Sequence, residues 1–143
     1  MRVLVTGATG FTGGHLARAL AGRGHQVRAL VRDERAGTAR AADLADFAAR
    51  GIAVAVGDLR DGPSLDRAAA GVDVVYHVAA TYRQAGITAD TYRAVNATAV
   101  GLIVGAAKRG GARRVVHCST VGVHGDVEGP PANEDAPLKP GDV

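Results

Sequence analysis

A short apolar strand that runs directly into a glycine-rich turn and a helix is the feature that most constrains this chain. The apolar run Val3–Val5 indicates a buried parallel strand, and apolar residues recur at helical spacing between Phe11 and Leu20. A helix N-terminus presents unpaired N–H groups and a partial positive charge. We therefore expect the turn at Thr6–Gly13 to bind an anion, with the pyrophosphate of a dinucleotide as the best fit. An ordinary glycine-rich strand–helix turn is the alternative.

Each glycine of this turn has its own expected role. Gly7 lets the chain turn sharply, Gly10 lets the backbone approach the phosphates, and Gly13 lets the helix pack closely on the strand. The spacing Gly-x-x-Gly-x-x-Gly is one residue longer than the common Gly-x-Gly-x-x-Gly. The cofactor contacts that we predict in the turn are Gly7, Thr9, Gly10, Phe11, Thr12 and Gly13.

Strand-like and helix-like segments alternate along most of the chain. The predicted strands are Arg2–Thr6, Gln26–Val31, Ala53–Val56, Val72–Val78 and Val115–Ser119. The predicted helices are Phe11–Gly22, Thr38–Arg50, Ser64–Ala70 and Thr88–Arg109. This order implies parallel crossovers and an α/β fold of the Rossmann type, a doubly wound parallel sheet.

The end of the chain differs in character from the rest. Residues 125–143 hold four of the five prolines, several acidic residues and no periodicity, which is typical of a loop. Five strands make one half of a doubly wound sheet and the start of the second. We therefore expect residues 1–143 to form an incomplete dinucleotide-binding domain, cut short after the fifth strand and without a C-terminal substrate region.

The composition narrows the cellular setting and the partners. A single cysteine, Cys118, excludes an internal disulfide and fits a reducing cytosol; we expect it to be a small buried strand residue. The N-terminus is a strand and a turn rather than a signal peptide, and no apolar run approaches the roughly 18 residues of a membrane helix. Basic residues are not interleaved with aromatic ones. We expect a cytoplasmic protein with a small-molecule substrate and no nucleic acid, membrane or metal partner.

The end of the second strand offers two contacts to an adenosine ribose. An acid there binds the 2′-hydroxyl of NAD, whereas an arginine pairs with the 2′-phosphate of NADP. The strand ends in the apolar Val31, and Arg32 and Asp33 follow, with Arg35 nearby. We favour NADP through Arg32. Asp33, about 20 residues past the turn, keeps NAD open, and Arg32 as a solvated loop charge is a further alternative.

Two further strand ends carry candidate cofactor contacts. Asp58 and Leu59 follow the third strand, where a carboxylate can accept the adenine amino group while leucine packs on the ring. A turn or N-cap aspartate is the alternative. Ala79 and Ala80 end the fourth strand and are small enough to let the ribose and nicotinamide lie close. In the same strand we expect His77 to be a packed residue rather than a catalyst.

These motifs resemble the extended short-chain dehydrogenases/reductases of the NAD-dependent epimerase/dehydratase family. The resemblance covers essentially the whole chain and rests on Thr6–Gly13, Gly57–Leu59, His77–Ala80, Val95-Asn96 and Val116–Gly125. It implies an oxidoreductase or epimerase/dehydratase that acts on a secondary alcohol or ketone. Nucleotide sugars, sterol-like alcohols and small ketones are the candidate substrates. We expect a homodimer at full length.

The resemblance also implies catalytic residues. Alignment on Gly125 places the family's catalytic hydroxyl, which hydrogen-bonds the reacting substrate oxygen, at Thr120, with Ser119 just before it. His124 replaces a common tyrosine. Asn96 matches a helix asparagine that we include among the cofactor contacts; a buried polar residue that braces the sheet is the alternative.

The family's proton-transfer pair, Tyr-x-x-x-Lys, is absent from this sequence. Tyr76, Tyr82 and Tyr92 each lack a lysine four residues later. We expect the natural protein to continue, with the tyrosine just beyond Val143, and this stretch alone to be inactive. Two other hypotheses stay open: a non-catalytic protein that senses NAD(P), and a stand-alone cofactor-binding module.

Overall fold

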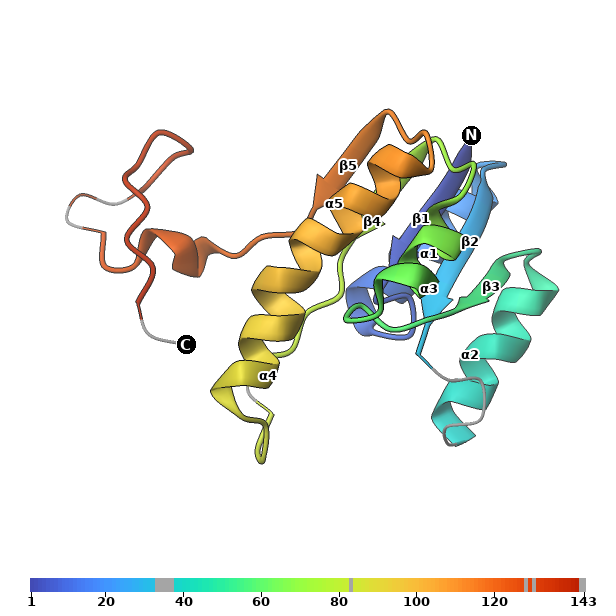
Figure 1. Cartoon of the computed structure of the whole chain (residues 1–143), viewed down its shortest axis with the longest axis horizontal. Coiled ribbons are helices and arrows are strands. Elements are labelled where there is room, and N and C mark those ends of the chain that lie inside the picture. Colours follow the sequence, from blue (N-terminus) through green and yellow to red (C-terminus); the bar gives the residue numbers. More distant parts are fainter. Residues whose placement is uncertain (33–37, 83, 128, 130, 142–143) are drawn as a thin grey trace.

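A five-stranded parallel sheet forms the centre of the protein (Figure 1). The computed structural model describes all residues except 33–37, 83, 128, 130 and 142–143. The strand order is β3-β2-β1-β4-β5. The strands are β1 (Arg2–Thr6), β2 (Gln26–Val31), β3 (Ala53–Val56), β4 (Val74–His77) and β5 (Arg114–His117). The strand order reverses at β1, so the carboxyl ends of β1 and β4 adjoin at the point where α/β folds bind ligands.

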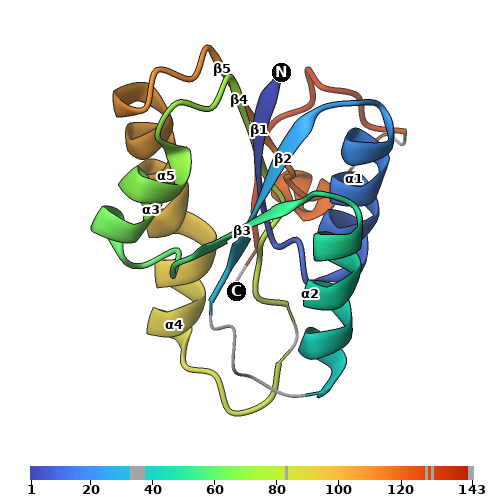
Figure 2. The same cartoon turned by 90° about the vertical axis from the view of Figure 1, so that its right-hand side faces the viewer.

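Helices cover both faces of the sheet, as Figure 2 shows, with α1 and α2 on one side and α3, α4 and α5 on the other. The helical elements are α1 (Phe11–Gly22), α2 (Thr38–Ala49), α3 (Gly62–Ala69), α4 (Ala89–Arg93), the π-helical η1 (Ala94–Thr98), α5 (Ala99–Arg109) and the 3₁₀ turn η2 (Val121–His124). Each face has its own hydrophobic core. Phe47 is fully buried in the core on the α1 and α2 side, and Leu65 and Ile103 are fully buried in the core on the other. This is the α/β fold that the sequence predicts.

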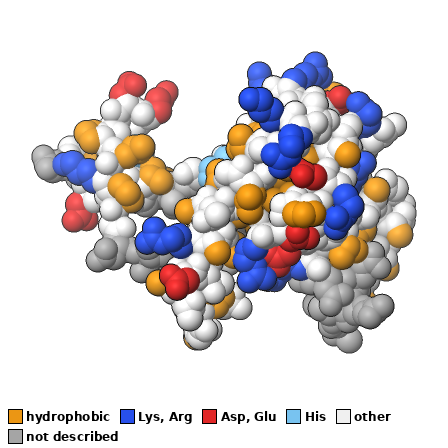
Figure 3. Space-filling view, in the orientation of Figure 1, with side chains coloured by type: hydrophobic (Ala, Val, Ile, Leu, Met, Phe, Trp, Pro, Cys, Tyr) orange, Lys and Arg blue, Asp and Glu red, His pale blue; other side chains and the backbone are white. Residues whose placement is uncertain are grey.

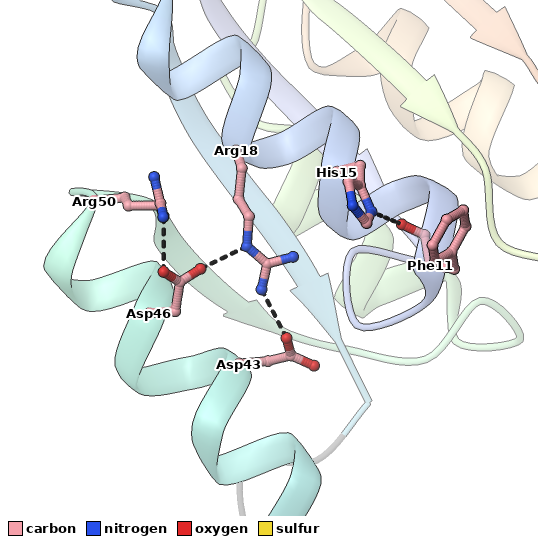
Figure 4. Close-up of polar contacts among 6 residues, drawn as sticks. All are labelled: Phe11, His15, Arg18, Asp43, Asp46 and Arg50. Atoms are coloured by element: carbon pink, nitrogen blue, oxygen red, sulfur yellow. Dashed lines mark hydrogen bonds and ion pairs between the residues drawn. The ribbon is translucent and has the colours of Figure 1, made fainter.

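A charged cluster holds α2 against α1 (Figure 4). The Arg18 guanidinium donates from Nε to Asp46 at 2.6 Å and from Nη2 to Asp43 at 2.8 Å, and it lies 5.5 Å from the centre of the Phe47 ring. Arg50 donates to the other oxygen of Asp46 at 2.7 Å. The hydrogen bonds from Arg18 and then Arg50 lower the pKa of Asp46. Residues from two helices therefore share one network, which ties α2 to α1.

The expected boundaries of the first three strands and of α1 are confirmed, and those of the other elements differ. The fourth and fifth strands are shorter than predicted, so Cys118 and Ser119 lie beyond β5. The long helix predicted at Thr88–Arg109 is divided by η1, and Thr88 is its N-cap, with a hydroxyl that accepts a hydrogen bond from Thr91 N. A cap residue resembles the helix in sequence but has extended backbone angles, which explains this one-residue difference.

The segment after β5 projects away from the sheet (Figure 1). It is irregular, as the sequence predicts, apart from η2. Val121 and Leu138 are largely exposed on it, and Figure 3 shows hydrophobic side chains over its surface. None of the helices in the described part of the chain is long and apolar enough to cross a bilayer.

Candidate cofactor-binding site

A cleft of about 840 Å³ opens at the carboxyl ends of β1 to β4. The structure brings nearly all the predicted cofactor contacts together along it, from segments that are up to 73 residues apart in the chain. The predicted contacts that line the cleft are Gly7, Thr9, Gly10, Phe11, Thr12, Gly13, Arg32, Asp58, Leu59, Ala79 and Ala80. A smaller hollow of about 300 Å³ in the projecting segment contains none of them. The larger cleft is therefore the candidate site.

The glycine turn has the geometry of an anion cradle. Gly7 has a φ of +70°, and its carbonyl accepts a hydrogen bond from Gly10 N at 2.9 Å. Gly10 is the N-cap of α1, where no side chain caps the helix and no acidic residue lies in the first turn. The first-turn N–H groups are thus left for a ligand, beside the open cleft.

Close approach explains the three glycines. A Cβ at Gly7 would lie 2.8 Å from Ala79 N, and a Cβ at Gly13 would collide with the Gly7 carbonyl. A Cβ at Gly10 would meet only Gly7 O, at 3.3 Å, within the protein. The fold therefore requires glycine at Gly7 and Gly13, whereas at Gly10 the space beside the backbone belongs to the cleft. Gly13 therefore lets α1 lie close to the backbone of the turn at Gly7 and Ala8, whereas the sequence predicted close packing on the strand.

Thr6 and His77 tie the glycine turn to the end of β4. The Thr6 hydroxyl accepts hydrogen bonds from Val78 N and Ala79 N, both at 3.2 Å, and contacts His77 Nδ1 at 2.7 Å. Since both lone pairs are taken, the hydroxyl donates to Nδ1, which places the imidazole proton on Nε2. Sequence reasoning missed this pair, because its two residues lie 71 positions apart.

His77 is fully buried, as a packed strand residue should be. Its Nε2 has no hydrogen-bond partner within the described part of the chain, and its ring stacks on His117 at 5.2 Å. Burial, and then the charge of His117, lowers the pKa of His77 to about 4. The imidazole is therefore neutral at pH 7 and acts as a structural hydrogen-bond acceptor.

Asp58 lines the cleft after β3, and its carboxylate accepts three hydrogen bonds from Arg60. Its Oδ1 accepts from Arg60 N at 2.8 Å and from Nε at 2.9 Å, and its Oδ2 accepts from Nη2 at 2.9 Å. These bonds, with a further contribution from Arg32, hold the pKa of Asp58 at about 2. The bond to the N–H two residues on is an Asx turn, so Asp58 is both a turn aspartate and a cleft residue. Arg60 also lines the cleft and was not predicted; its place two residues after the aspartate was the available signal.

Arg32 is exposed at the end of β2 and lines the cleft, next to the buried Val31. Asp33 and Arg35, the other residues considered for the ribose, lie outside the described residues.

Asn96 does not line the cleft and instead braces it. Its Oδ1 accepts from Thr81 N and its Nδ2 donates to Thr81 O, both at 2.8 Å. Thr81 belongs to the loop after β4 that forms the cleft wall with Ala79 and Ala80. Asn96 therefore braces its surroundings through hydrogen bonds, as the alternative interpretation expected, but it braces the loop after β4 and not the sheet.

Thr120 and Ser119 follow β5 and lie outside the cleft lining, and both are exposed. Thr120 is the N-cap of η2, and its Oγ1 accepts from Gly122 N at 3.2 Å. The expectation of a buried strand residue at Cys118 is wrong: it lies one residue beyond β5, an edge strand of the sheet, and its side chain is exposed at the cleft.

Comparison with known proteins agrees with this geometry. The model of the NAD dependent epimerase/dehydratase family matches residues 3–143. The chain belongs to this family. Sterol demethylase protein B of Methylococcus capsulatus is 38% identical over 144 residues, which cover 99% of this chain and 42% of that protein.

Solved structures of family relatives share the fold. A short-chain dehydrogenase/reductase superfamily protein from Agrobacterium tumefaciens with bound NAD is 32% identical, with a TM-score of 0.81 over 99% of this chain and 40% of that one. A dTDP-glucose 4,6-dehydratase from Streptomyces venezuelae with NAD bound is 33% identical, with a TM-score of 0.82 over 98% and 46%. The chain thus spans less than half the length of these relatives.

Proposed function

We propose that the chain binds a nicotinamide adenine dinucleotide in the cleft and contributes the cofactor half of an oxidoreductase or epimerase/dehydratase. The observation that carries this proposal is the uncapped N-terminus of α1 behind Gly10, which faces no acidic residue in its own first turn. A Cβ at Gly10 would point into the cleft and not into the protein, so the absence of a side chain there allows a phosphate to approach the backbone closely. The NAD bound to relatives of the same fold supports this assignment.

The residues along the cleft suggest the orientation of the dinucleotide. Its pyrophosphate would lie on Gly7–Gly13, its adenine against Asp58 and Leu59, and its nicotinamide ribose near Ala79 and Ala80. When bound, the nicotinamide supplies or accepts hydride, and a secondary alcohol or ketone is the substrate class that this chemistry serves.

Arg32 favours NADP over NAD within this proposal. It lines the adenosine end of the cleft, and the strand before it ends in apolar Val31 rather than an acid. A charge-assisted pair with a 2′-phosphate contributes roughly 1.5–3 kcal/mol, equivalent to about ten- to a hundredfold in affinity.

Thr120 is the residue that we propose to hold the reacting substrate oxygen. Its Oγ1 accepts from Gly122 N, an arrangement that leaves the hydroxyl proton for a substrate oxygen. The sequence lacks a Tyr-x-x-x-Lys pair that could move the accompanying proton. The alternative is a dinucleotide-sensing protein without chemistry. Because these 143 residues span less than half the length of the relatives, turnover of alcohols and ketones by a chain extended to the relatives' length separates the two.

Calorimetric titration of parent and Gly10→Val with NADPH and NADH tests the proposal. The φ of −93° at Gly10 suits any residue, so the variant should fold and lose most of its affinity because valine fills the phosphate position. Gly22→Val, at a helical glycine with open space around it, is the matched control and should bind like the parent. Equal affinity of Gly10→Val and parent would rule out the pyrophosphate site.

A further inference from the structure

Three hydrogen bonds join Arg60 to one carboxylate at the adenosine end of the cleft. We propose that Arg60 is a positioning residue that sets the base specificity of the cofactor site, by fixing the Asp58 carboxylate so that it accepts the 6-amino group of adenine and rejects a 6-oxo purine. This inference rests on the proposed binding of a dinucleotide with its adenine at Asp58.

The three bonds leave the carboxylate one direction in which to accept. A carboxylate oxygen has about two lone-pair positions. Arg60 fills both on Oδ1, with its backbone N–H at 2.8 Å and Nε at 2.9 Å, and one on Oδ2, with Nη2 at 2.9 Å. The remaining position on Oδ2 can accept one N–H. An amino group provides that donor, whereas a carbonyl oxygen there would face an anion with no proton between them.

The backbone of Asp58 is fixed as well. Its N–H donates to the hydroxyl of buried Ser64 at 3.1 Å, and Ser64 lies in the first turn of α3. Asp58 is therefore fixed twice: Ser64 of α3 holds its main chain, and Arg60 holds its carboxylate.

The ion pair between Arg60 and Asp58 orients the carboxylate and adds little to the stability of the fold. The Arg60 side chain is 56% exposed and that of Asp58 30% exposed, and exposed ion pairs contribute little to stability. An ordinary aspartate is already ionised at neutral pH, so Asp58 does not need Arg60 to carry its charge there. What Arg60 adds is a fixed plane for the carboxylate, and its removal should affect recognition of the base and spare the fold.

The test compares two cofactors that differ only at position 6 of the base. Dissociation constants of nicotinamide adenine dinucleotide phosphate and its hypoxanthine counterpart are measured by calorimetry at pH 7 for the parent chain, Arg60→Met and Arg60→Lys. Arg67→Met, at an exposed arginine of α3 that does not line the cleft, is the matched control. Circular dichroism checks the fold of each variant.

We expect the parent and Arg67→Met to prefer the adenine form by about ten- to a hundredfold, as one hydrogen bond to a charged acceptor implies. Arg60→Met should reduce that ratio to about threefold or less, mainly by weaker binding of the adenine form. Arg60→Lys keeps the charge without the planar fork and should fall between them.

An unchanged adenine preference in folded Arg60→Met would overturn this inference and leave dinucleotide binding intact. A parent that binds both forms equally would overturn it too. A parent that binds neither form would overturn the proposed function itself.

Discussion

The buried His77 should make the stability of this protein fall as the pH drops below neutrality. Its pKa is about 4 in the folded chain and about 6.5 when unfolded, because burial disfavours the imidazolium. The unfolded state therefore binds one more proton between these values, so the stabilisation is complete above the unfolded pKa and is lost as the pH falls towards 4. The two pKa values imply a loss of about 2 kcal/mol in the free energy of unfolding between about pH 7.5 and pH 5.

Urea unfolding followed by circular dichroism at several pH values measures this loss. Three carboxylates have lowered pKa values: Asp46 and Asp58, described above, and Asp73, which accepts a hydrogen bond from Arg2 N at 2.7 Å. They lose their contributions at more acidic pH, so His77 should account for most of the change above pH 5.

His77→Leu is the informative variant. It leaves the Thr6 hydroxyl without its acceptor and should lower stability by about 1–3 kcal/mol at pH 7.5. Between pH 7.5 and pH 5 the stability of the variant should change by less than about half as much as that of the parent. The same pH dependence in parent and variant would refute the assignment of His77 as a buried neutral residue.

Three further predictions concern the glycine turn, the cofactor preference and turnover. Gly13→Ala forces a methyl group into the Gly7 carbonyl and should cost about 3 kcal/mol or more in urea unfolding, whereas Gly22→Ala, with open space around it, should be neutral or slightly stabilising. Arg32→Ala should reduce the calorimetric preference for NADPH over NADH by about ten- to a hundredfold and leave NADH binding unchanged; tighter NADH binding by the parent would contradict the role of Arg32. In a nicotinamide absorbance assay, the 143-residue chain should show no turnover with alcohols or ketones, because loss of a general acid/base alone costs about 10²–10⁴-fold, and measurable turnover would mean that the proton-transfer residues lie within it.

The fold and the cleft contacts could be predicted from the sequence wherever they depend on residues that are neighbours in the chain or on the common edge of the strands. The apolar run, the glycine turn and the helix after it occupy consecutive residues, so the start of the sheet and the bounds of α1 could be predicted from them. The cleft contacts Asp58, Ala79 and Ala80 could be placed because the carboxyl ends of parallel strands meet at one edge of a sheet.

Side-chain pairing between distant segments could not be predicted in this way. The bond of Thr6 to His77 and the hold of Asn96 on Thr81 depend on strand order and loop path, which no local pattern specifies. The exposure of Cys118 depends on which strand lies at the edge of the sheet. Arg60 could have been predicted as a cleft residue from its position two residues after Asp58. Its hydrogen bonds to Asp58 could not, because they depend on the turn that the chain makes there.

Amide hydrogen exchange with and without NADPH tests the central claim most directly, because it reports on every segment of the cleft at once. Saturating cofactor should slow exchange in three segments far apart in sequence, residues 7–13, 57–60 and 78–81, which together line the cleft. The hollow between residues 124 and 139 should exchange as before. Unchanged exchange at residues 7–13 under saturating NADPH, or protection confined to the projecting segment, would contradict the account.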